Sequence, residues 1–267
     1  MLKFRLIIIV VYCLKRIKLK IIFGNMSKFK IFKGIYKSFA NAKKHSKGNI
    51  FLDKKYIIKT YKELKSSFEN SSDFINFTQR YRGFGNFLIS AYSFKKKINI
   101  IDFGGGMGNG YYYLKKTIPS NKFNKINYHI VDEIKLIKKS KKLNKNIKYN
   151  VMIPKIKTDV FVTSSSIQYL DDLDKFLDNV IKLKPKYLIF FDVFSGNIPN
   201  YYTLQRYYNI LHPHSFLNEK QFISKFNRSG YELIFKDISV VTRAGNQISL
   251  DMSNFPKKYR ISNSKNY

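Results

Sequence analysis

The chain has 267 residues, enough for one α/β core with an N-terminal extension. Its formal charge of +33 would ordinarily indicate a nucleic-acid or an anionic membrane partner. However, 42 of the 50 basic residues are Lys, Asn is frequent and Ala is rare, as expected for an A+T-rich genome. Much of the charge is therefore expected to be solvated lysine on every face. Guanidinium groups, which suit phosphate best, are few, so a nucleic-acid partner stays open but is not favoured.

The cysteine and histidine content excludes a disulfide within the chain and a metal cluster built from thiols. Cys13 is the only cysteine, so an intramolecular disulfide is impossible and a reducing, cytoplasmic setting is expected. The four histidines, His45, His129, His212 and His214, have no zinc-like spacing with acidic partners. We therefore expect no metal site.

Residues 1–26 form a basic, apolar N-terminal extension. The apolar run Leu6–Leu14 is shorter than the roughly 20 residues that a membrane-spanning helix needs, and no signal-peptidase site follows it. An interfacial anchor, a buried strand or helix, and an upstream extension with Met26 as the true start all stay open. Any peripheral membrane contact, at the inner face of the membrane, depends on residues 1–25.

Residues 27–97 are expected to form a helical cap. Apolar residues recur near helical spacing in Tyr56–Phe68 and again in Asp73–Phe94. The second segment contains Arg80, Tyr81 and Arg82, which could meet an acidic substrate, although a solvated face is the more frequent role of such a cluster.

The centre of the chain is a strand, a glycine-rich turn and a helix. Ile98–Asp102 predicts a buried strand, and a helix is expected from Gly110 to Ile118, where Pro119 ends it. The intervening positions hold Gly104, Gly105, Gly106 and Gly108. Since side chains are nearly absent, the backbone can adopt positive φ and lie against a ligand, and the free N–H groups of the helix face that ligand.

Spacing separates the chemistries that use such a turn. A phosphate loop needs Lys and then Ser or Thr after its last glycine, but Tyr111 and Tyr112 follow here. A dinucleotide fingerprint needs glycines at relative positions 1, 3 and 6, and no register fits. The pattern Asp102-x-Gly-x-Gly-x-Gly instead resembles the first motif of class I S-adenosylmethionine (SAM) methyltransferases. The resemblance implies SAM as the cofactor, with its methionine part wrapped by the turn.

The rest of the chain repeats the strand-and-helix pattern. Strands are expected at 126–131, 147–152, 159–163 and 187–193, and helices at 134–143, 171–183 and from Asn218 to Gly230. A closing hairpin is expected from 231–241 and 247–252. We therefore expect an α/β, Rossmann-like class I methyltransferase fold: a seven-stranded, mostly parallel sheet with an antiparallel closing hairpin, over residues 98–256, preceded by the helical segment and followed by a tail at 257–267.

Polar residues stand where two of these strands end. Asp132 ends the second strand, and in SAM-binding sheets an acid there accepts hydrogen bonds from the ribose hydroxyls. Glu133 is the second choice, and the pair could also cap the following helix. Ser164 and Ser165 follow the fourth strand, at the edge where α/β sheets bind ligands, and are expected at the cofactor or the substrate.

Several segments together resemble a narrower group. They are FKGIYKSFANA at 32–42, IIDFGGGMGNGYY at 100–112, SSSIQYLDD at 164–172, FFDVF at 190–194 and HPHSFLNEKQF at 212–222. Over residues 31–260 they resemble a bacterial family of SAM-dependent methyltransferases associated with lipopolysaccharide and surface-polysaccharide genes. That family usually has Glu at the position of Asp132. The resemblance implies O-methylation of a sugar or glycan.

The acceptor side of the site is expected after the fifth strand. Residues 195–216 have no clear period, and such a long connection is usually functional, so we expect a substrate lid there. If the acceptor is a hydroxyl, a general base helps. The candidates are His212 and His214, then Asp192 and Tyr169. The alternatives are an RNA methyltransferase that uses the basic surface and a non-catalytic SAM-binding protein.

Overall fold

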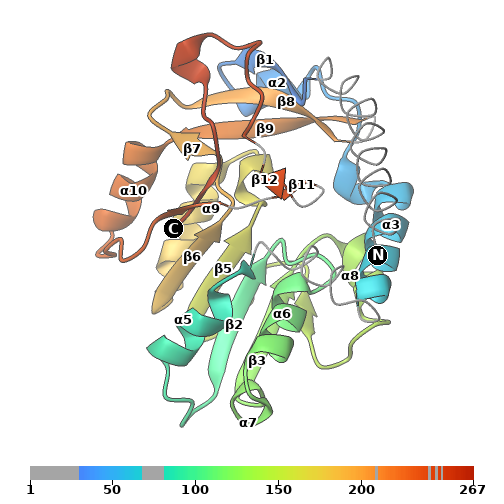
Figure 1. Cartoon of the computed structure of the whole chain (residues 1–267), viewed down its shortest axis with the longest axis vertical. Coiled ribbons are helices and arrows are strands. Elements are labelled where there is room, and N and C mark those ends of the chain that lie inside the picture. Colours follow the sequence, from blue (N-terminus) through green and yellow to red (C-terminus); the bar gives the residue numbers. More distant parts are fainter. Residues whose placement is uncertain (1–29, 68–80, 208–209, 240–241, 244–245, 248) are drawn as a thin grey trace, which may run out of the picture.

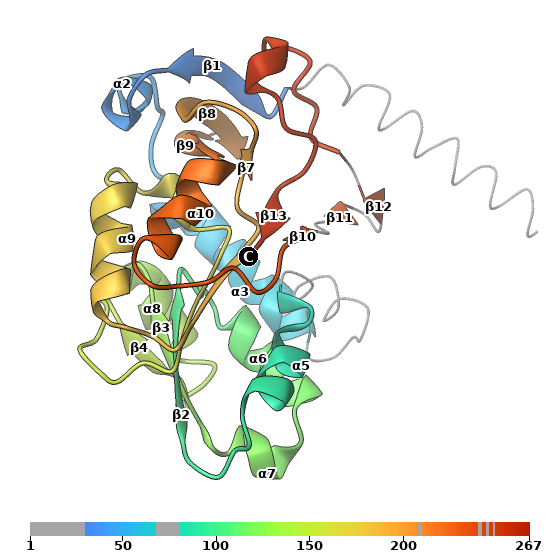
Figure 2. The same cartoon turned by 90° about the vertical axis from the view of Figure 1, so that its left-hand side faces the viewer.

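The computed structural model describes residues 30–67, 81–207, 210–239, 242–243, 246–247 and 249–267. The N-terminal extension at 1–26, and Arg80 of the arginine cluster, lie outside these residues. A parallel sheet with helices on both faces forms one part, and a smaller, mostly antiparallel sheet lies beyond the carboxyl ends of its central strands (Figures 1 and 2). Within the described ranges, no helix combines the length and the apolar character that crossing a membrane requires.

Five parallel strands form the centre. They are β2 (Ile98–Phe103), β3 (Ile126–Val131), β4 (Lys148–Asn150), β5 (Val160–Ser164) and β6 (Tyr187–Phe191), in the order β4-β3-β2-β5-β6. All neighbouring pairs are parallel. Ile100, Ile101 and Phe161 are fully buried, because a parallel sheet is covered on both faces and its strands are therefore apolar throughout. The prediction of these strands is confirmed.

The helices cover the two faces as separate layers. On one face α3 (Lys54–Ser67), α5 (Phe84–Ala91) and α6 (Asn109–Thr117) share a core cluster with the sheet. The other face carries α9 (Leu173–Lys182) and α10 (Glu219–Asn227). Both helices have side-chain caps: Asp172 Oδ1 accepts from Lys175 N–H at 3.0 Å, and Asn218 Oδ1 accepts from Gln221 N–H at 2.9 Å. Short helices α7 (Ser120–Phe123) and α8 (Ile134–Ser140) complete the connections.

The sheet continues past β6 through two further strands. Phe190 exchanges both backbone hydrogen bonds with Tyr267 at 2.8 Å, and Val193 exchanges both with Lys265 at 2.8 Å. This places β13 (Lys265–Asn266) antiparallel to β6, and β13 in turn pairs antiparallel with β10 (Asp237–Ile238). The five parallel strands, β13 and β10 make seven. One of them, next to the edge, is antiparallel, so the chain has the Rossmann-like fold of class I methyltransferases.

The residues that supply the closing strands differ from those predicted. Among the described residues of 231–241 only Asp237–Ile238 form a strand in this sheet, and the described residues of 247–252 do not belong to it. Instead β11 (Thr242–Arg243) and β12 (Asn246–Gln247) form a separate small hairpin. The antiparallel position is taken by residues from 257–267, which were expected to be a tail. Two strand residues are too few to give a periodic signal in sequence.

The second sheet corrects two predictions. It consists of β1 (Phe32–Tyr36), β8 (Tyr201–Tyr207), β9 (Ile210–Asn218) and β7 (Ser195–Gly196), in the order β1-β8-β9-β7. Residues 195–216, expected as a lid without regular structure, are therefore mostly strand. The cap at 27–97 is not purely helical, because it contributes β1 as well as α2 (Phe39–Lys43). The pairing of β1 with β8 joins segments far apart in sequence, which local patterns do not reveal.

Candidate cofactor and acceptor site

The glycine turn joins β2 to α6 beside the end of β5. Gly104 has φ +70° and Gly106 has φ +58°, in the region that favours glycine. A Cβ on Gly104 would lie 2.0 Å from Ser166 Oγ, and one on Gly105 would lie 2.7 Å from Asp102 Oδ2. Gly108 precedes the first residue of α6. A Cβ on Gly104 or Gly105 would therefore collide with a neighbouring side chain, whereas a Cβ on Gly106 would meet nothing within 4 Å. The turn is open at Gly106, where its backbone is the surface that a ligand would meet.

Asp102 lies beneath the turn and is fully buried. Its carboxylate accepts a hydrogen bond from Tyr128 Oη at 2.7 Å and from Tyr81 Oη at 3.1 Å. Burial raises the pKa of Asp102 to about 7, and the two hydroxyls partly offset this rise. Since it is enclosed, Asp102 supports the turn from below. Sequence reasoning missed both tyrosines, whose role follows from non-local contacts.

Asp132 holds the turn from the side of β3. Its Oδ2 accepts from Gly106 N–H at 2.7 Å, and its Oδ1 accepts from Glu133 N–H at 2.7 Å. Burial raises the pKa of Asp132 to about 6. A carboxylate has about four acceptor positions, so two remain for other donors such as a vicinal diol. Glu133 is exposed and its side chain makes no capping bond to α8.

Two hydroxyls at the end of β5 have no partner among the described residues. Thr163 Oγ1 and Ser164 Oγ are both buried and unpaired, whereas Ser166 Oγ donates to Ser164 O at 2.8 Å. An unpaired buried hydroxyl costs about 1–3 kcal/mol. The end of β5 therefore offers hydrogen-bonding groups that a bound molecule or water would satisfy.

Asp192 occupies a bulge after β6. Between the hydrogen-bonded pairs Phe190–Tyr267 and Val193–Lys265, two residues, of which Asp192 is one, lie opposite the single residue Asn266. The φ of Asp192 is +57°. Its carboxylate accepts from Ser165 Oγ and from Ser264 Oγ, and its N–H donates to Asn266 Oδ1 at 3.0 Å. Ser165 also has positive φ, +53°. The predicted base is thus occupied in joining the end of β5 to the C-terminal strand.

Replacing Asp192 with alanine is expected to lower the melting temperature by several degrees. The variant leaves the Ser165 and Ser264 hydroxyls without their buried acceptor, at a cost of about 2–3 kcal/mol. Differential scanning calorimetry measures the change. Asp171→Ala is the control, because that carboxylate lies on the surface and pairs only with Lys43 Nζ at 3.4 Å. Equal melting temperatures for both variants would show that Asp192 does not stabilise the contact between the end of β5 and the C-terminal strand.

The two candidate histidines and Tyr169 lie together. Tyr169, in the 3₁₀ turn η4 (Ile167–Tyr169), has its ring 5.2 Å from that of His212 and 5.5 Å from that of His214. Both histidines belong to β9. The Tyr169 hydroxyl donates to Gln205 Oε1 at 2.6 Å. The structure therefore brings three of the four predicted base candidates into one group, and places Asp192 in the separate bulge.

The two histidines differ in their surroundings. His214 is fully buried, with the rings of Phe32, Phe194 and Phe216 at 4.6–5.0 Å, and neither of its nitrogens has a partner among the described residues. Burial lowers its pKa well below the usual range. His212 is 7% exposed, and its Nδ1 is unpaired. Burial lowers the pKa of His212 as well, so both imidazoles are neutral near pH 7 and can accept a proton.

Gln168 is a buried polar residue beside β9 that was not singled out among the candidate site residues. It is 1% exposed, and its Oε1 and Nε2 are both buried without a partner. It stands two residues after Ser166, which contacts the glycine turn, and its carbonyl accepts from Ser215 Oγ of β9 at 3.2 Å. The Ser-x-x-Gln-Tyr-Leu run was the available signal. An amide with a free donor and a free acceptor suits a hydroxyl-bearing ligand.

A metal centre is not found in the described part of the chain, where no three histidine, cysteine or acidic residues are grouped to hold an ion.

Comparison with known proteins gives distant structural similarity only. No protein-family model and no curated protein matches the chain. A 1,6-didemethyltoxoflavin-N1-methyltransferase from Burkholderia thailandensis is 11% identical, with a TM-score of 0.46, covering 72% of this chain and 84% of its own. A SAM-dependent methyltransferase from Clostridium acetobutylicum is 13% identical, with a TM-score of 0.41. The match covers 70% of this chain and 89% of that methyltransferase. The glycopeptide N-methyltransferase MtfA is 11% identical, with a TM-score of 0.41. The match covers 61% of this chain and 88% of MtfA. The function proposed below is therefore based on this chain's own residues.

Proposed function

We propose that the chain is a SAM-dependent methyltransferase. The observation that carries this proposal is the glycine turn at Gly104–Gly108, fixed from below by Asp102 and at its side by the hydrogen bond from Gly106 N–H to Asp132. The turn lacks the residues that a phosphate loop or a dinucleotide site needs. The remaining acceptor positions of Asp132 suit ribose hydroxyls, and the unpaired hydroxyls of Thr163 and Ser164 lie on the next strand. These groups fit SAM.

Bound SAM supplies a methyl group that is already activated by the positive sulfonium. The protein must then align a nucleophile with the methyl carbon and exclude water. Gly104–Gly108 and Asp132 would fix the cofactor. The acceptor would lie on the side of Gln168 and β9, because Ser166 and Gln168 connect the turn to that strand.

The acceptor that we propose is a hydroxyl of a sugar or glycan in cell-surface polysaccharide assembly. The five segments quoted above support the class of acceptor. The unpaired amide of Gln168 and the neutral imidazoles support a hydroxyl, which can donate and accept at once. His212 is the preferred base, because His214 is enclosed by aromatic rings. A neutral imidazole accepts the hydroxyl proton as the oxygen–methyl bond forms.

One observation favours an RNA acceptor as the second candidate. Five exposed lysines follow Asp132 on α8 and the loop after it, beside the proposed ribose site: Lys135, Lys138, Lys141, Lys142 and Lys145. Such a row attracts a phosphate backbone. An acceptor screen distinguishes the candidates, since it would give methylated RNA in one case and methylated glycan in the other. A SAM-binding protein without activity would give neither.

The first experiment is a calorimetric titration with S-adenosylhomocysteine, with NADH as the control ligand. We expect micromolar affinity, and loss of binding in Gly106→Asp, because the new side chain would occupy the open space beside the turn, and the residue would retain an unfavourable φ of +58°. A folded chain that binds NADH and not S-adenosylhomocysteine would be a dehydrogenase-like protein instead.

Asp132 and Glu133 should differ sharply as ribose contacts. Asp132→Asn is expected to weaken S-adenosylhomocysteine binding about 10- to 100-fold, because an amide provides fewer acceptor positions and loses the charge-assisted bonds. Glu133→Gln should change affinity less than twofold, since its side chain is exposed. The same calorimetry measures both. If Glu133→Gln weakened binding more than Asp132→Asn did, Glu133 rather than Asp132 would be the carboxylate that binds the ribose.

A further inference from the structure

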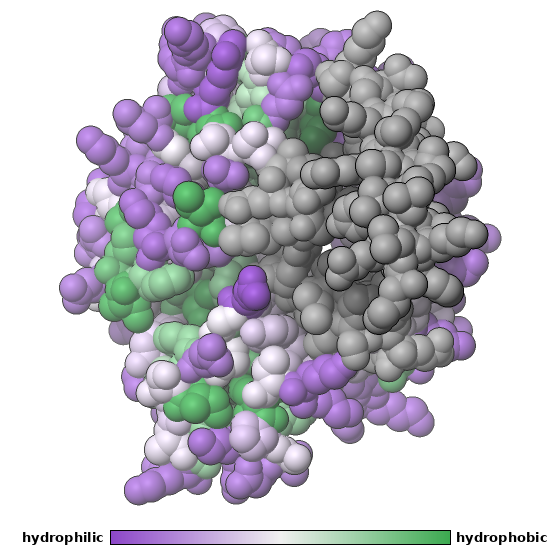
Figure 3. All heavy atoms as spheres, viewed as in Figure 1, coloured by the Kyte–Doolittle hydropathy of each residue, from purple (hydrophilic) through white to green (hydrophobic). Residues whose placement is uncertain are grey.

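The lysines of the chain are not spread evenly over its surface. Residues 52–65, which run from the end of the 3₁₀ turn η2 (Ile50–Leu52) through most of α3, hold five lysines and two acids. Residues 133–148, which contain α8, hold seven lysines and one acid. On the other face of the sheet, residues 171–182 hold four acids and two lysines. Positive charge is therefore concentrated around α3 and α8, which lie on the right in Figure 1, and hydrophilic side chains line that margin in Figure 3.

The segments 52–65 and 133–148 form one continuous surface, which we call the basic face. η2, α3 and α8 contact one another, and α3 and α8 share a core cluster beneath the surface. Lys139 Nζ of α8 lies 4.4 Å from the centre of the Tyr61 ring of α3, within the range of a cation–π contact. Among the residues that the structure describes, Glu63 is the only acid paired with these lysines, through Lys59 Nζ at 3.5 Å. Most of the positive charge is thus left for a partner of opposite sign.

Three large aliphatic side chains are exposed on the basic face. Leu52 ends η2, Ile58 lies in the second turn of α3, and Ile134 is the first residue of α8. Their exposed fractions are 37%, 37% and 46%. Most of the side chains that neighbour Ile58 one turn away on α3 are exposed lysines: Lys54, Lys55 and Lys62. Aliphatic side chains within a lysine-rich surface are typical of segments that lie in a membrane interface.

The aliphatic side chains distinguish a membrane from a nucleic acid as the partner of this face. A phosphate backbone is held by the charge of lysines, and unpaired bases stack on aromatic rings. Aliphatic side chains serve neither contact, and the ring of Tyr61 is covered by Lys139. An anionic membrane attracts the lysines and also takes up aliphatic side chains between its headgroups. The basic face therefore suits an anionic membrane better than RNA.

We propose that the basic face docks the chain onto an anionic membrane surface, with its three exposed aliphatic side chains inserted among the lipid headgroups. The face adjoins the acceptor side of the proposed site, because the ring of Phe51 in η2 lies 5.1 Å from that of Tyr169 and 5.4 Å from that of His212. Docking would therefore bring the acceptor side to the membrane. The docking itself does not depend on the methyltransferase proposal, since it is measured without SAM.

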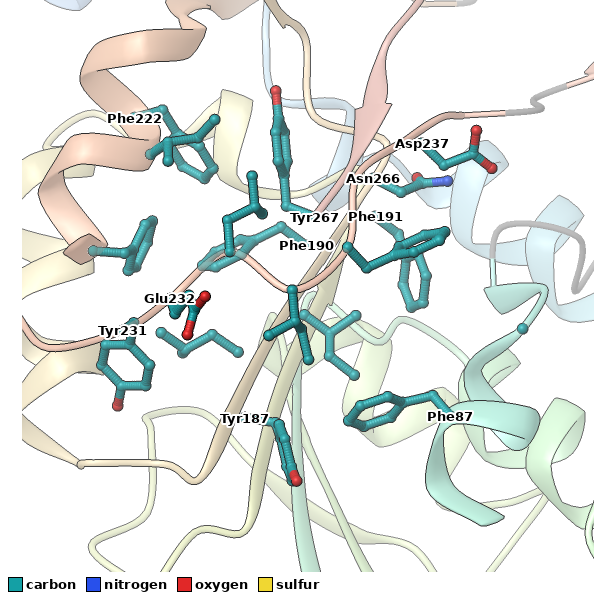
Figure 4. Close-up of a pocket in the computed structure, with 18 of the residues that line it drawn as sticks. Phe87, Tyr187, Phe190, Phe191, Phe222, Tyr231, Glu232, Asp237, Asn266 and Tyr267 are labelled. Carbon is teal, nitrogen blue, oxygen red and sulfur yellow. The ribbon is translucent and has the colours of Figure 1, made fainter. Parts of the chain in front are cut away.

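A second pair of exposed aliphatic residues provides a matched control. Leu233 and Ile234 are 40% and 69% exposed. They border a cavity of about 750 Å³ beside β6, where the acids Glu232 and Asp237 also lie (Figure 4). α8 connects β3 to β4, at the opposite edge of the five parallel strands. This pair thus has the residue types of the basic face without its positive surroundings.

Co-sedimentation of the full chain with phospholipid vesicles tests the proposal. We expect binding at least about tenfold tighter to phosphatidylcholine vesicles with about 30% phosphatidylglycerol than to pure phosphatidylcholine, and weaker binding as salt is added. Leu52→Ser combined with Ile58→Ser leaves the net charge unchanged and should weaken binding to the anionic vesicles about tenfold. Leu233→Ser combined with Ile234→Ser should change it less than about twofold.

A fluorescence measurement shows whether the basic face enters the lipid. The chain has no Trp, so one introduced Trp reports only its own surroundings. The emission of Ile58→Trp should shift to shorter wavelengths with anionic vesicles and be quenched by lipids that carry bromine on their acyl chains. Ile234→Trp should show neither change. Because this signal appears on binding, a variant that merely folds less well does not imitate it.

Three results would overturn the proposal. The first is undetectable binding of the chain to anionic vesicles. The second is equal binding by the two serine double variants, which would assign vesicle binding to other residues, such as the extension at 1–25. The third is an unchanged emission of Ile58→Trp on bound vesicles. Tight binding of RNA by the chain, unaffected by the serine substitutions and without any vesicle binding, would make the basic face a nucleic-acid surface instead.

Discussion

Replacing Gly104 with alanine is expected to weaken S-adenosylhomocysteine binding at least 100-fold. The new Cβ would lie 2.0 Å from Ser166 Oγ and 2.5 Å from Ser166 Cβ, so one of the two segments must move. Ser166 is held by its bond to Ser164 O at 2.8 Å. In addition, φ +70° costs a non-glycine residue about 1–2 kcal/mol. Isothermal titration calorimetry on the folded variant measures the loss.

Gly230→Ala is the matched control for this variant. Gly230 has φ +84°, but a Cβ there would meet nothing within 4 Å. The control therefore carries the backbone strain without the collision, and it lies after α10, away from the turn. We expect a small loss of stability and unchanged affinity. If Gly104→Ala binds as tightly as this control, the turn is not the cofactor site.

Asp102→Asn is expected to change how stability depends on pH. The Asp102 carboxyl binds its proton more tightly in the folded chain, where its pKa is about 7, than in the unfolded chain, where the ordinary value is 3.8. Its contribution to stability is therefore complete below about pH 4 and is lost as the pH rises through 7. A difference of about three pKa units corresponds to at most about 4 kcal/mol. Asparagine stays neutral and can still accept from Tyr81 and Tyr128, so the variant should not lose this stability.

Urea unfolding at intervals from pH 4 to pH 8 tests the prediction. The free energy of unfolding of Asp102→Asn relative to the unmodified chain should rise steadily over this range. Asp251→Asn provides the control, because Lys30 Nζ at 2.5 Å lowers the pKa of Asp251 to about 2. That contribution is complete above about pH 4 and is lost only below it, so the stability difference between Asp251→Asn and the unmodified chain should stay constant from pH 4 to pH 8. Parallel curves for Asp102→Asn and the unmodified chain would show that Asp102 is not the titrating group.

The parallel sheet could be predicted from sequence because its signals are local. The strand at 126–131 was predicted with its observed bounds, since a short apolar run ends at two acidic residues. The second sheet could not be predicted in this way. β8 and β9 hold many aromatic residues without a clear period, and their pairing depends on β1, far away along the chain. β13 is too short to show any pattern.

The candidate site was predictable to a similar extent. The glycine spacing predicted Gly106, and its place at the end of the second strand predicted Asp132, as residues of one cofactor site. The structure joins the two by a hydrogen bond of 2.7 Å. The supporting hydroxyls of Tyr81 and Tyr128 could not be inferred, because a tyrosine in an apolar run gives no sign that its hydroxyl meets a buried acid. Asp192 had the opposite outcome. Its place at a strand end suggested a base, yet its carboxylate is held by two serines.

The antiparallel sheet also affects how the chain can fold during synthesis. Lys33 of β1 and Thr203 of β8 are neighbours in the sheet but stand 170 positions apart. At about 5–20 residues per second, the ribosome needs roughly 10–30 seconds to add the partner of β1. During that interval the aromatic edge of β1 has no strand to pair with, while the five parallel strands can already assemble. We therefore expect the nascent chain to engage holdase chaperones through its first strand, and to release them once β9 has emerged.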